Sequence, residues 1–138
     1  MKRIIFTALV FILLLSSASF AAEIVIANNS VPVDALSKEK LKNIYLGKKS
    51  QWDNGNKIVV VMLKKGPVHE NFIKNMVKKS AAQFSSFWKK LIFTGKGKPP
   101  KAFATEAELV KYVSETADAI GYIDEATAHE NVKVIAVN

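Results

Sequence analysis

The stretch VVVMLKKGPVHENF, residues 59–72, predicts a strand that runs directly into a helix. Its first five residues are apolar and rich in valine, which is typical of a buried strand. Gly66 suits the N-cap position of a helix, and Pro67 suits the first helical position. A strand that leads at once into a helix is the repeating unit of α/β folds, so this junction indicates the fold class.

The same junction is a candidate anion site. The start of a helix gathers unpaired backbone N–H groups and the positive end of the helix dipole, and two lysines precede this start. The pattern is also that of an ordinary helix start that binds only water, and the residues leave both interpretations open. The candidate anion-binding residues are Lys64, Lys65, Gly66, Val68 and His69.

The rest of the chain alternates between strand and helix patterns. Further strands are expected at residues 23–27, 119–123 and 132–137, beside the central strand at 58–63. We expect an α/β fold with a largely parallel or mixed sheet of about four strands, flanked by helices.

Three helix starts carry N-cap residues. Ser37, Ser80 and Thr105 each precede a run with helical spacing of apolar residues. The last two have glutamine or glutamate three residues later, which predicts capping boxes. Residues 68–93 are therefore expected to form two helices, the second beginning after Ser80.

Residues 1–21 have the features of a secretory signal peptide. A basic start precedes a 12-residue apolar run at 4–15 and a group of small residues. Cleavage is expected after Ala21, with Ala22 as the alternative. The apolar run is shorter than a membrane-spanning helix requires. We expect residues 22–138 to be one domain, released into the periplasm without membrane insertion.

Composition narrows the classes of partner. The chain has 20 basic and 12 acidic residues, which favours anionic partners. Nearly all the basic residues are scattered lysines without an arginine cluster or an aromatic RNA-binding motif, so we expect no nucleic-acid binding. The absence of cysteine excludes disulfides, cysteine catalysis and thiolate metal sites.

Motifs for catalysis are incomplete. His69 and Glu70 are not followed by the second histidine of a zinc protease motif, because position 73 is isoleucine. Ser85 and Ser86 lack the glycines of a nucleophile elbow. We therefore expect a protein that is not an enzyme, with no catalytic residues, no metal and no cofactor.

Three segments together carry a family resemblance, and it covers about residues 24–128. The segments are LSKEKLKNIYLGKKSQW at 36–52, FWKKLIFTGKGKPPKAF at 87–103 and VKYVSETADAIGYID at 110–124. They resemble the second lobe of phosphate ABC transporter substrate-binding proteins, of the type II periplasmic binding protein superfamily. The resemblance implies the fold of one such lobe, and a tight turn at Gly121 that leads into a strand with Tyr122 in the core or at the functional edge.

The chain departs from this family in its phosphate loop. The resemblance implies an Arg-Ser-Asp-Gly-Ser-Gly-Thr-Thr loop just before Phe72. Aligned back from Phe72, its arginine, serine, glycine and first threonine are replaced by Met62, Gly66, Pro67 and Val68. No side-chain ligand of the phosphate loop is left, so only weak anion binding is expected at the 64–69 junction.

Two functions follow from these observations. The first is a periplasmic binding module for phosphate or another small anion, acting alone or as a homodimer whose second copy supplies the missing wall of the cleft. The second is an adaptor that binds no small ligand and docks on an envelope transporter, porin or sensor through its lysine-rich surface.

Overall fold

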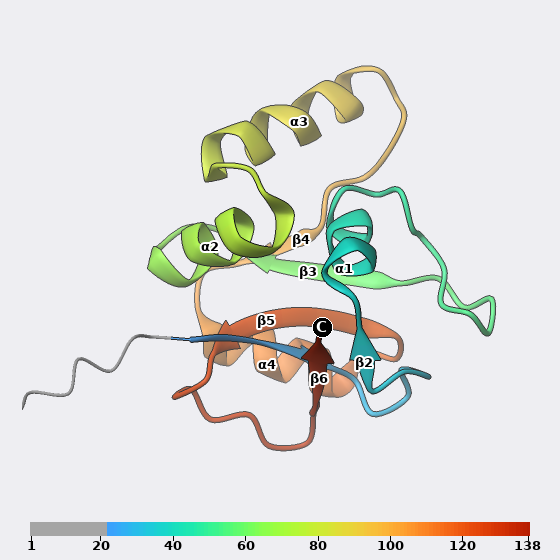
Figure 1. Ribbon diagram of the computed structural model, residues 1–138, viewed down its shortest axis with the longest axis vertical. Helices are drawn as coiled ribbons and strands as arrows, with labels where there is room; N and C mark the ends of the chain where they lie inside the picture. Colours follow the sequence, from blue (N-terminus) through green and yellow to red (C-terminus); the bar gives the residue numbers. More distant parts are fainter. Residues whose placement is uncertain (1–21) are drawn as a thin grey trace, which may run out of the picture.

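The computed structural model describes residues 22–138, and Figure 1 shows their arrangement. The predicted signal peptide, residues 1–21, lies outside the described part. No helix within residues 22–138 combines the length and apolar character needed to cross a membrane.

The strands are β1 (Glu23–Ala27), β2 (Ala35–Leu36), β3 (Val59–Leu63), β4 (Lys101–Phe103), β5 (Ala119–Asp124) and β6 (Lys133–Val137). The helices are α1 (Lys38–Tyr45), α2 (Pro67–Phe72), the π-helix η1 (Ile73–Val77), α3 (Ala81–Phe93) and α4 (Glu106–Glu115).

The strands form one mixed sheet in the order β2-β6-β1-β5-β3-β4. β1 is antiparallel to β5 and β6, whereas β3 is parallel to β4 and β5, and β2 is parallel to β6. The predicted α/β class is confirmed, but the sheet has six strands instead of about four. The two additional strands are the edge strands β2 and β4, of two and three residues, which are too short to show a period in the sequence.

The predicted helix starts are confirmed. The hydroxyl groups of Ser37, Ser80 and Thr105 each accept a hydrogen bond from the backbone N–H three residues later, at 3.1 to 3.2 Å. The side chain of Gln83 accepts from the backbone N–H of Ser80 and completes the capping box there. Residues 68–93 are divided between separate helices, as predicted, and the second begins after Ser80. The π-helix η1, which precedes it, was not predicted.

Gly121 lies inside β5, so the expectation of a tight turn at this residue was wrong. A Cβ at Gly121 would lie 2.8 Å from Cγ2 of Val61 and 2.9 Å from Cδ2 of Leu109, which indicates that the glycine lets α4 approach the sheet closely. The next side chain, Tyr122, is fully buried on the other face, against Phe72 of α2. α4 and α2 therefore cover opposite faces of β5 (Figure 1).

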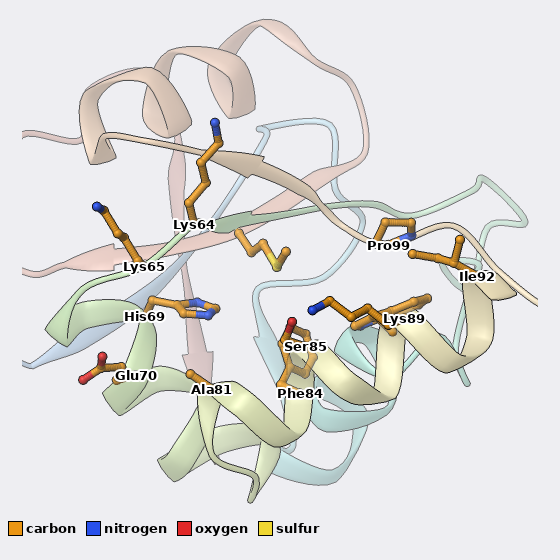
Figure 2. Close-up of a pocket in the computed structure, with 12 residues that line it drawn as sticks. Lys64, Lys65, His69, Glu70, Ala81, Phe84, Ser85, Lys89, Ile92 and Pro99 are labelled. Atoms are coloured by element: carbon orange, nitrogen blue, oxygen red, sulfur yellow. The ribbon is translucent and has the colours of Figure 1, made fainter.

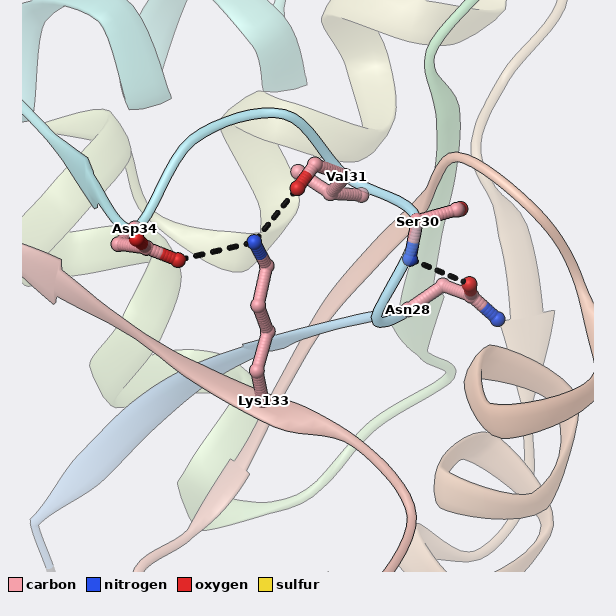
Figure 3. A network of polar contacts seen from close by, with 5 residues as sticks. All are labelled: Asn28, Ser30, Val31, Asp34 and Lys133. Atoms are coloured by element: carbon pink, nitrogen blue, oxygen red, sulfur yellow. Dashed lines mark hydrogen bonds and ion pairs between the residues drawn. The ribbon is translucent and has the colours of Figure 1, made fainter.

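A polar network ties the β1–β2 loop to β6 (Figure 3). The ammonium group of Lys133 donates to the carbonyl oxygen of Val31 at 2.5 Å and to Oδ1 of Asp34 at 3.0 Å. Within the loop, the backbone N–H of Ser30 donates to Oδ1 of Asn28 at 2.9 Å. The Asp34 side chain is 93% exposed, so this ion pair contributes at most about 1 kcal/mol and serves mainly to hold the loop in place.

Candidate functional site

The β3–α2 junction has the predicted backbone. Gly66 is the N-cap of α2 with φ of 104°, a conformation that favours glycine, and Pro67 follows at the first helical position. No side chain caps this helix start. α2 has only six residues, so few peptide dipoles are aligned and its N–H groups alone make a weak anion site.

A cavity of about 280 Å³ lies beside this junction, between α2, the end of β3 and α3 (Figure 2). Of the predicted residues, Lys64, Lys65 and His69 line the cavity, whereas Gly66 and Val68 do not. The full lining consists of Met62, Lys64, Lys65, His69, Glu70, Ala81, Phe84, Ser85, Trp88, Lys89, Ile92 and Pro99. Three of the five predicted residues therefore contribute to the wall of the cavity.

The two predicted lysines are at the rim. Figure 2 shows the ammonium groups of Lys64 and Lys65 directed away from the cavity, and both residues are exposed. The ammonium group of Lys89 instead extends across the cavity toward His69, with the hydroxyl group of Ser85 beside it (Figure 2). Lys89 and Ser85 are exposed residues like the two rim lysines, but the cation directed toward His69 comes from α3 and not from the strand-to-helix junction.

Sequence reasoning did not single out Ser85 and Lys89, which also line the cavity. They lie one helical turn apart on α3, so both side chains face the same way. Trp88, on the same side of this helix, is buried, and its indole N–H donates to the carbonyl oxygen of Tyr45 at 3.1 Å. The i, i+4 pair could have been noticed in the sequence, but its position opposite His69 depends on how α3 packs.

His69 is the only polar or charged residue among the buried residues in the described part of the chain, with 5% of its surface exposed. Its Nδ1 is in hydrogen-bond contact with the hydroxyl group of Tyr122. That hydroxyl oxygen already accepts from the backbone N–H of Leu63 at 3.1 Å, so its own proton is free to be donated to Nδ1. With Tyr122 as the donor, the proton of the neutral imidazole ring is on Nε2.

The Nε2 atom faces the cavity without a protein partner. Within residues 22–138 it forms no hydrogen bond, and it is not among the polar atoms fully covered by protein. Burial lowers the pKa of His69 below its usual value of 6.5, and the nearby Glu70 only partly offsets this effect. At neutral pH the ring is therefore uncharged and offers one N–H donor to the cavity.

An aromatic cluster fixes the position of Tyr122. Its ring stacks on Phe72 with centroids 3.8 Å apart and an angle of 8° between the ring planes. The edge of Tyr45 packs against Phe72 at 5.0 Å, and the Tyr45 hydroxyl group donates to the carbonyl oxygen of Val61 at 3.0 Å. Because Tyr122 stacks on Phe72 and its ring centroid also lies 5.8 Å from that of Tyr45, it in turn holds the ring of His69 in one orientation.

A second hollow of about 780 Å³ adjoins the first across Trp88 and Pro99. The basic loop at 95–100 forms one of its walls, together with Lys49 and Lys57. No buried polar side chain lines it, so it lacks the fixed donor that His69 supplies in the first cavity. No group of three histidine, cysteine, aspartate or glutamate side chains in residues 22–138 is placed to hold a metal ion.

Comparison with solved structures identifies the fold. An ABC-type phosphate transport receptor from Vibrio cholerae matches with a TM-score of 0.65 and 18% identity, over 85% of this chain and 46% of that chain. A phosphate ABC transporter substrate-binding protein with bound phosphate from Clostridium perfringens matches with a TM-score of 0.67 and 21% identity, over 85% and 45%. This chain has the fold of one part of such binding proteins.

PstS from Borrelia burgdorferi gives a similar match, with a TM-score of 0.64 and 18% identity, over 86% of this chain and 47% of that chain. The fold implied by the three resembling segments is thus confirmed. The chain spans less than half the length of each of these three proteins. No protein-family model matches the chain, and no curated protein matches it by sequence.

Proposed function

We propose that this protein is a binding module for small anions and that the anion sits in the 280 Å³ cavity between α2 and α3. The observation that carries the proposal is the buried His69, whose unpartnered Nε2–H faces the ammonium group of Lys89 and the hydroxyl group of Ser85. One cation and two neutral donors that converge on one space match the oxygen atoms of an anion. The named functions of the structural neighbours, phosphate receptors and binding proteins, support the same class of ligand.

The affinity for phosphate is expected to be low. Three donors replace only part of the hydration of a phosphate ion, and the rim lysines are exposed and screened by salt. We expect a dissociation constant of roughly 1 mM, which corresponds to about −4 kcal/mol. The site contributes binding and no chemistry, so the protein is proposed not to be an enzyme.

The test is a phosphate titration of the purified protein at constant ionic strength, followed by NMR. Replacing Lys89 with glutamine is expected to weaken binding by about fivefold, because the cation directed toward His69 is lost. Lys90→Gln is the matched control, since it removes the same charge from the next position on α3, outside the cavity lining. Equal effects of the two replacements would mean that the ion binds elsewhere.

The location of the module is proposed from its N-terminal sequence. Residues 1–21 direct export, and cleavage near Ala21 or Ala22 releases the binding module into the periplasm. N-terminal sequencing of the protein from the periplasmic fraction checks this proposal. A chain that keeps Met1 in the cytoplasmic fraction would refute it.

A second candidate function is docking on an acidic envelope protein. Phe93 at the end of α3 is 93% exposed and Ile92 is 48% exposed. Residues 71–105, which include this helix, carry eight lysines and no aspartate or glutamate. An exposed apolar residue in a lysine-rich segment matches an acidic surface with an apolar centre, whereas a second copy of this chain would bring like charges together. Cross-linking from a photoreactive side chain at position 93 in living cells would identify such a transporter, porin or sensor.

A further inference from the structure

We propose that the preferred ligand of the 280 Å³ cavity is an organic anion, with an anionic head group on a compact apolar body, and that inorganic phosphate is a poor substitute. This inference rests on the proposed function, since it names the class of ligand for the same site. Three observations carry it: the size of the cavity, the apolar character of most of its wall, and the position of the possible anion ligands at one end, with Ile92 and Pro99 at the other.

The cavity is larger than an inorganic oxyanion needs. Its 280 Å³ would hold roughly nine water molecules at the volume of about 30 Å³ that each occupies in the liquid. Phosphate has five heavy atoms, so it would leave more than half of this space to water. A ligand with one small ring or branched chain beside its anionic group would fill the cavity, which lies just below the size range of sites for small organic molecules.

Most of the wall cannot bind the oxygen atoms of an anion. Six lining side chains are apolar, and Phe84 and Trp88 among them are also buried in the core and cannot turn away. The six are Met62, Ala81, Phe84, Trp88, Ile92 and Pro99. Water against such a wall forms few hydrogen bonds with the protein, so replacing it with an apolar group of the ligand is favourable.

His69, Ser85 and Lys89 lie together toward one end of the cavity, with the ring of Phe84 6.3 Å from that of His69, and Ile92 and Pro99 lie at the other end. Figure 2 shows His69 at one end and Ile92 with Pro99 at the other, while Ser85 and Lys89 project from the middle of α3 toward His69. The carboxylate of Glu70 points outward, away from this polar end (Figure 2). An anionic head group would therefore lie between His69 and Lys89, with its apolar body directed toward Ile92.

The test measures the affinity of three probes for the purified exported protein by calorimetry at constant ionic strength. The probes are inorganic phosphate, phenyl phosphate and benzyl alcohol, which represent the head group alone, head group with ring, and ring alone. Phenyl phosphate is expected to bind at least tenfold more tightly than phosphate, and benzyl alcohol is expected not to bind. Phosphate binding as tightly as phenyl phosphate would overturn this inference and leave the proposed function standing, whereas binding of neither anion would overturn both.

A pair of neighbouring variants locates the apolar end. Ile92→Ser is expected to weaken phenyl phosphate about fivefold and leave phosphate unchanged, because Ile92 lines the cavity away from the head group. Phe93→Ser is the control, since Phe93 is more exposed and does not line the cavity. Both positions are on the surface, and circular dichroism verifies that each variant is folded. A phenyl phosphate preference that Ile92→Ser does not alter would place the ring elsewhere and overturn the inference.

Discussion

The hydroxyl group of Tyr122 is in hydrogen-bond contact with Nδ1 of His69, a residue 53 positions earlier in the chain. The tyrosine lies in the centre of the sheet and the histidine on a short helix above it, so the bond joins the core to the wall of the cavity. Its consequence is chemical as well as structural. With Tyr122 as the donor, the proton of the neutral imidazole is on Nε2, and the ring of His69 lies opposite Lys89 and Ser85 (Figure 2).

Two replacements of His69 separate the two ring nitrogens. An asparagine side chain can place an acceptor near the position of Nδ1, and a glutamine side chain can place a donor near the position of Nε2. His69→Asn is expected to keep the bond with Tyr122 and to weaken phosphate binding about fivefold, the effect of losing one hydrogen bond of about 1 kcal/mol.

His69→Gln is expected to bind phosphate more tightly than His69→Asn and to be less stable, because Tyr122 loses its acceptor in the core. NMR titration gives the affinities, and urea unfolding gives the free energies of unfolding. His129→Gln is the control at a histidine outside the cavity lining. If both His69 variants bind phosphate as the wild type does, Nε2 is not a ligand.

Stability should fall in acid because of His69. Its pKa is lowered in the folded protein, so the unfolded chain, with a usual value of 6.5, binds the proton more readily. The contribution of neutral His69 is therefore fully present above pH 6.5 and is lost as the pH falls below that value. The melting temperature of the wild type should drop further than that of His69→Asn between pH 7.5 and pH 5. If the melting temperatures of the two proteins fell equally with pH, His69 would not be the residue responsible.

Gly121→Ala should destabilise the fold without touching the cavity. The added methyl group meets Val61 and Leu109 at less than 3.0 Å, and overpacking of this kind costs about 1–3 kcal/mol. Gly97→Ala is the comparison, since Gly97 is exposed, its new Cβ lies 3.3 Å from the Trp88 ring, and a surface change costs within about 0.5 kcal/mol. Urea unfolding measures both. A Gly121→Ala protein as stable as the wild type would show that α4 can shift.

The rim lysines should matter less than Lys89. Their ammonium groups point out of the cavity, so they act on a bound anion only through screened, longer-range attraction (Figure 2). Replacing Lys64 and Lys65 together with alanine is expected to weaken phosphate binding less than the single replacement Lys89→Gln does, and the effect should vanish in 0.5 M salt. If the double variant loses more affinity for phosphate than Lys89→Gln does, the rim lysines are the main cationic ligands.

Much of the local structure follows from the sequence. Short-range rules were sufficient where a residue and its partner lie within one turn of each other, as at the N-caps Ser37, Ser80 and Thr105. The apolar run of β3 and the Gly66–Pro67 helix start are likewise local signals, and both are present in the structure. The fold class followed because these local elements alternate along the chain.

Tertiary structure alone decided the composition of the site. Lys64 and Lys65 are adjacent to the helix start in sequence, yet their ammonium groups point away from the cavity, while Ser85 and Lys89 come from a helix that begins after a left-handed turn at Lys78. The same holds for Gly121, where the close approach of α4, not a turn, requires the glycine. These features depend on which surfaces pack together, and packing between distant segments leaves no periodic signal in either one.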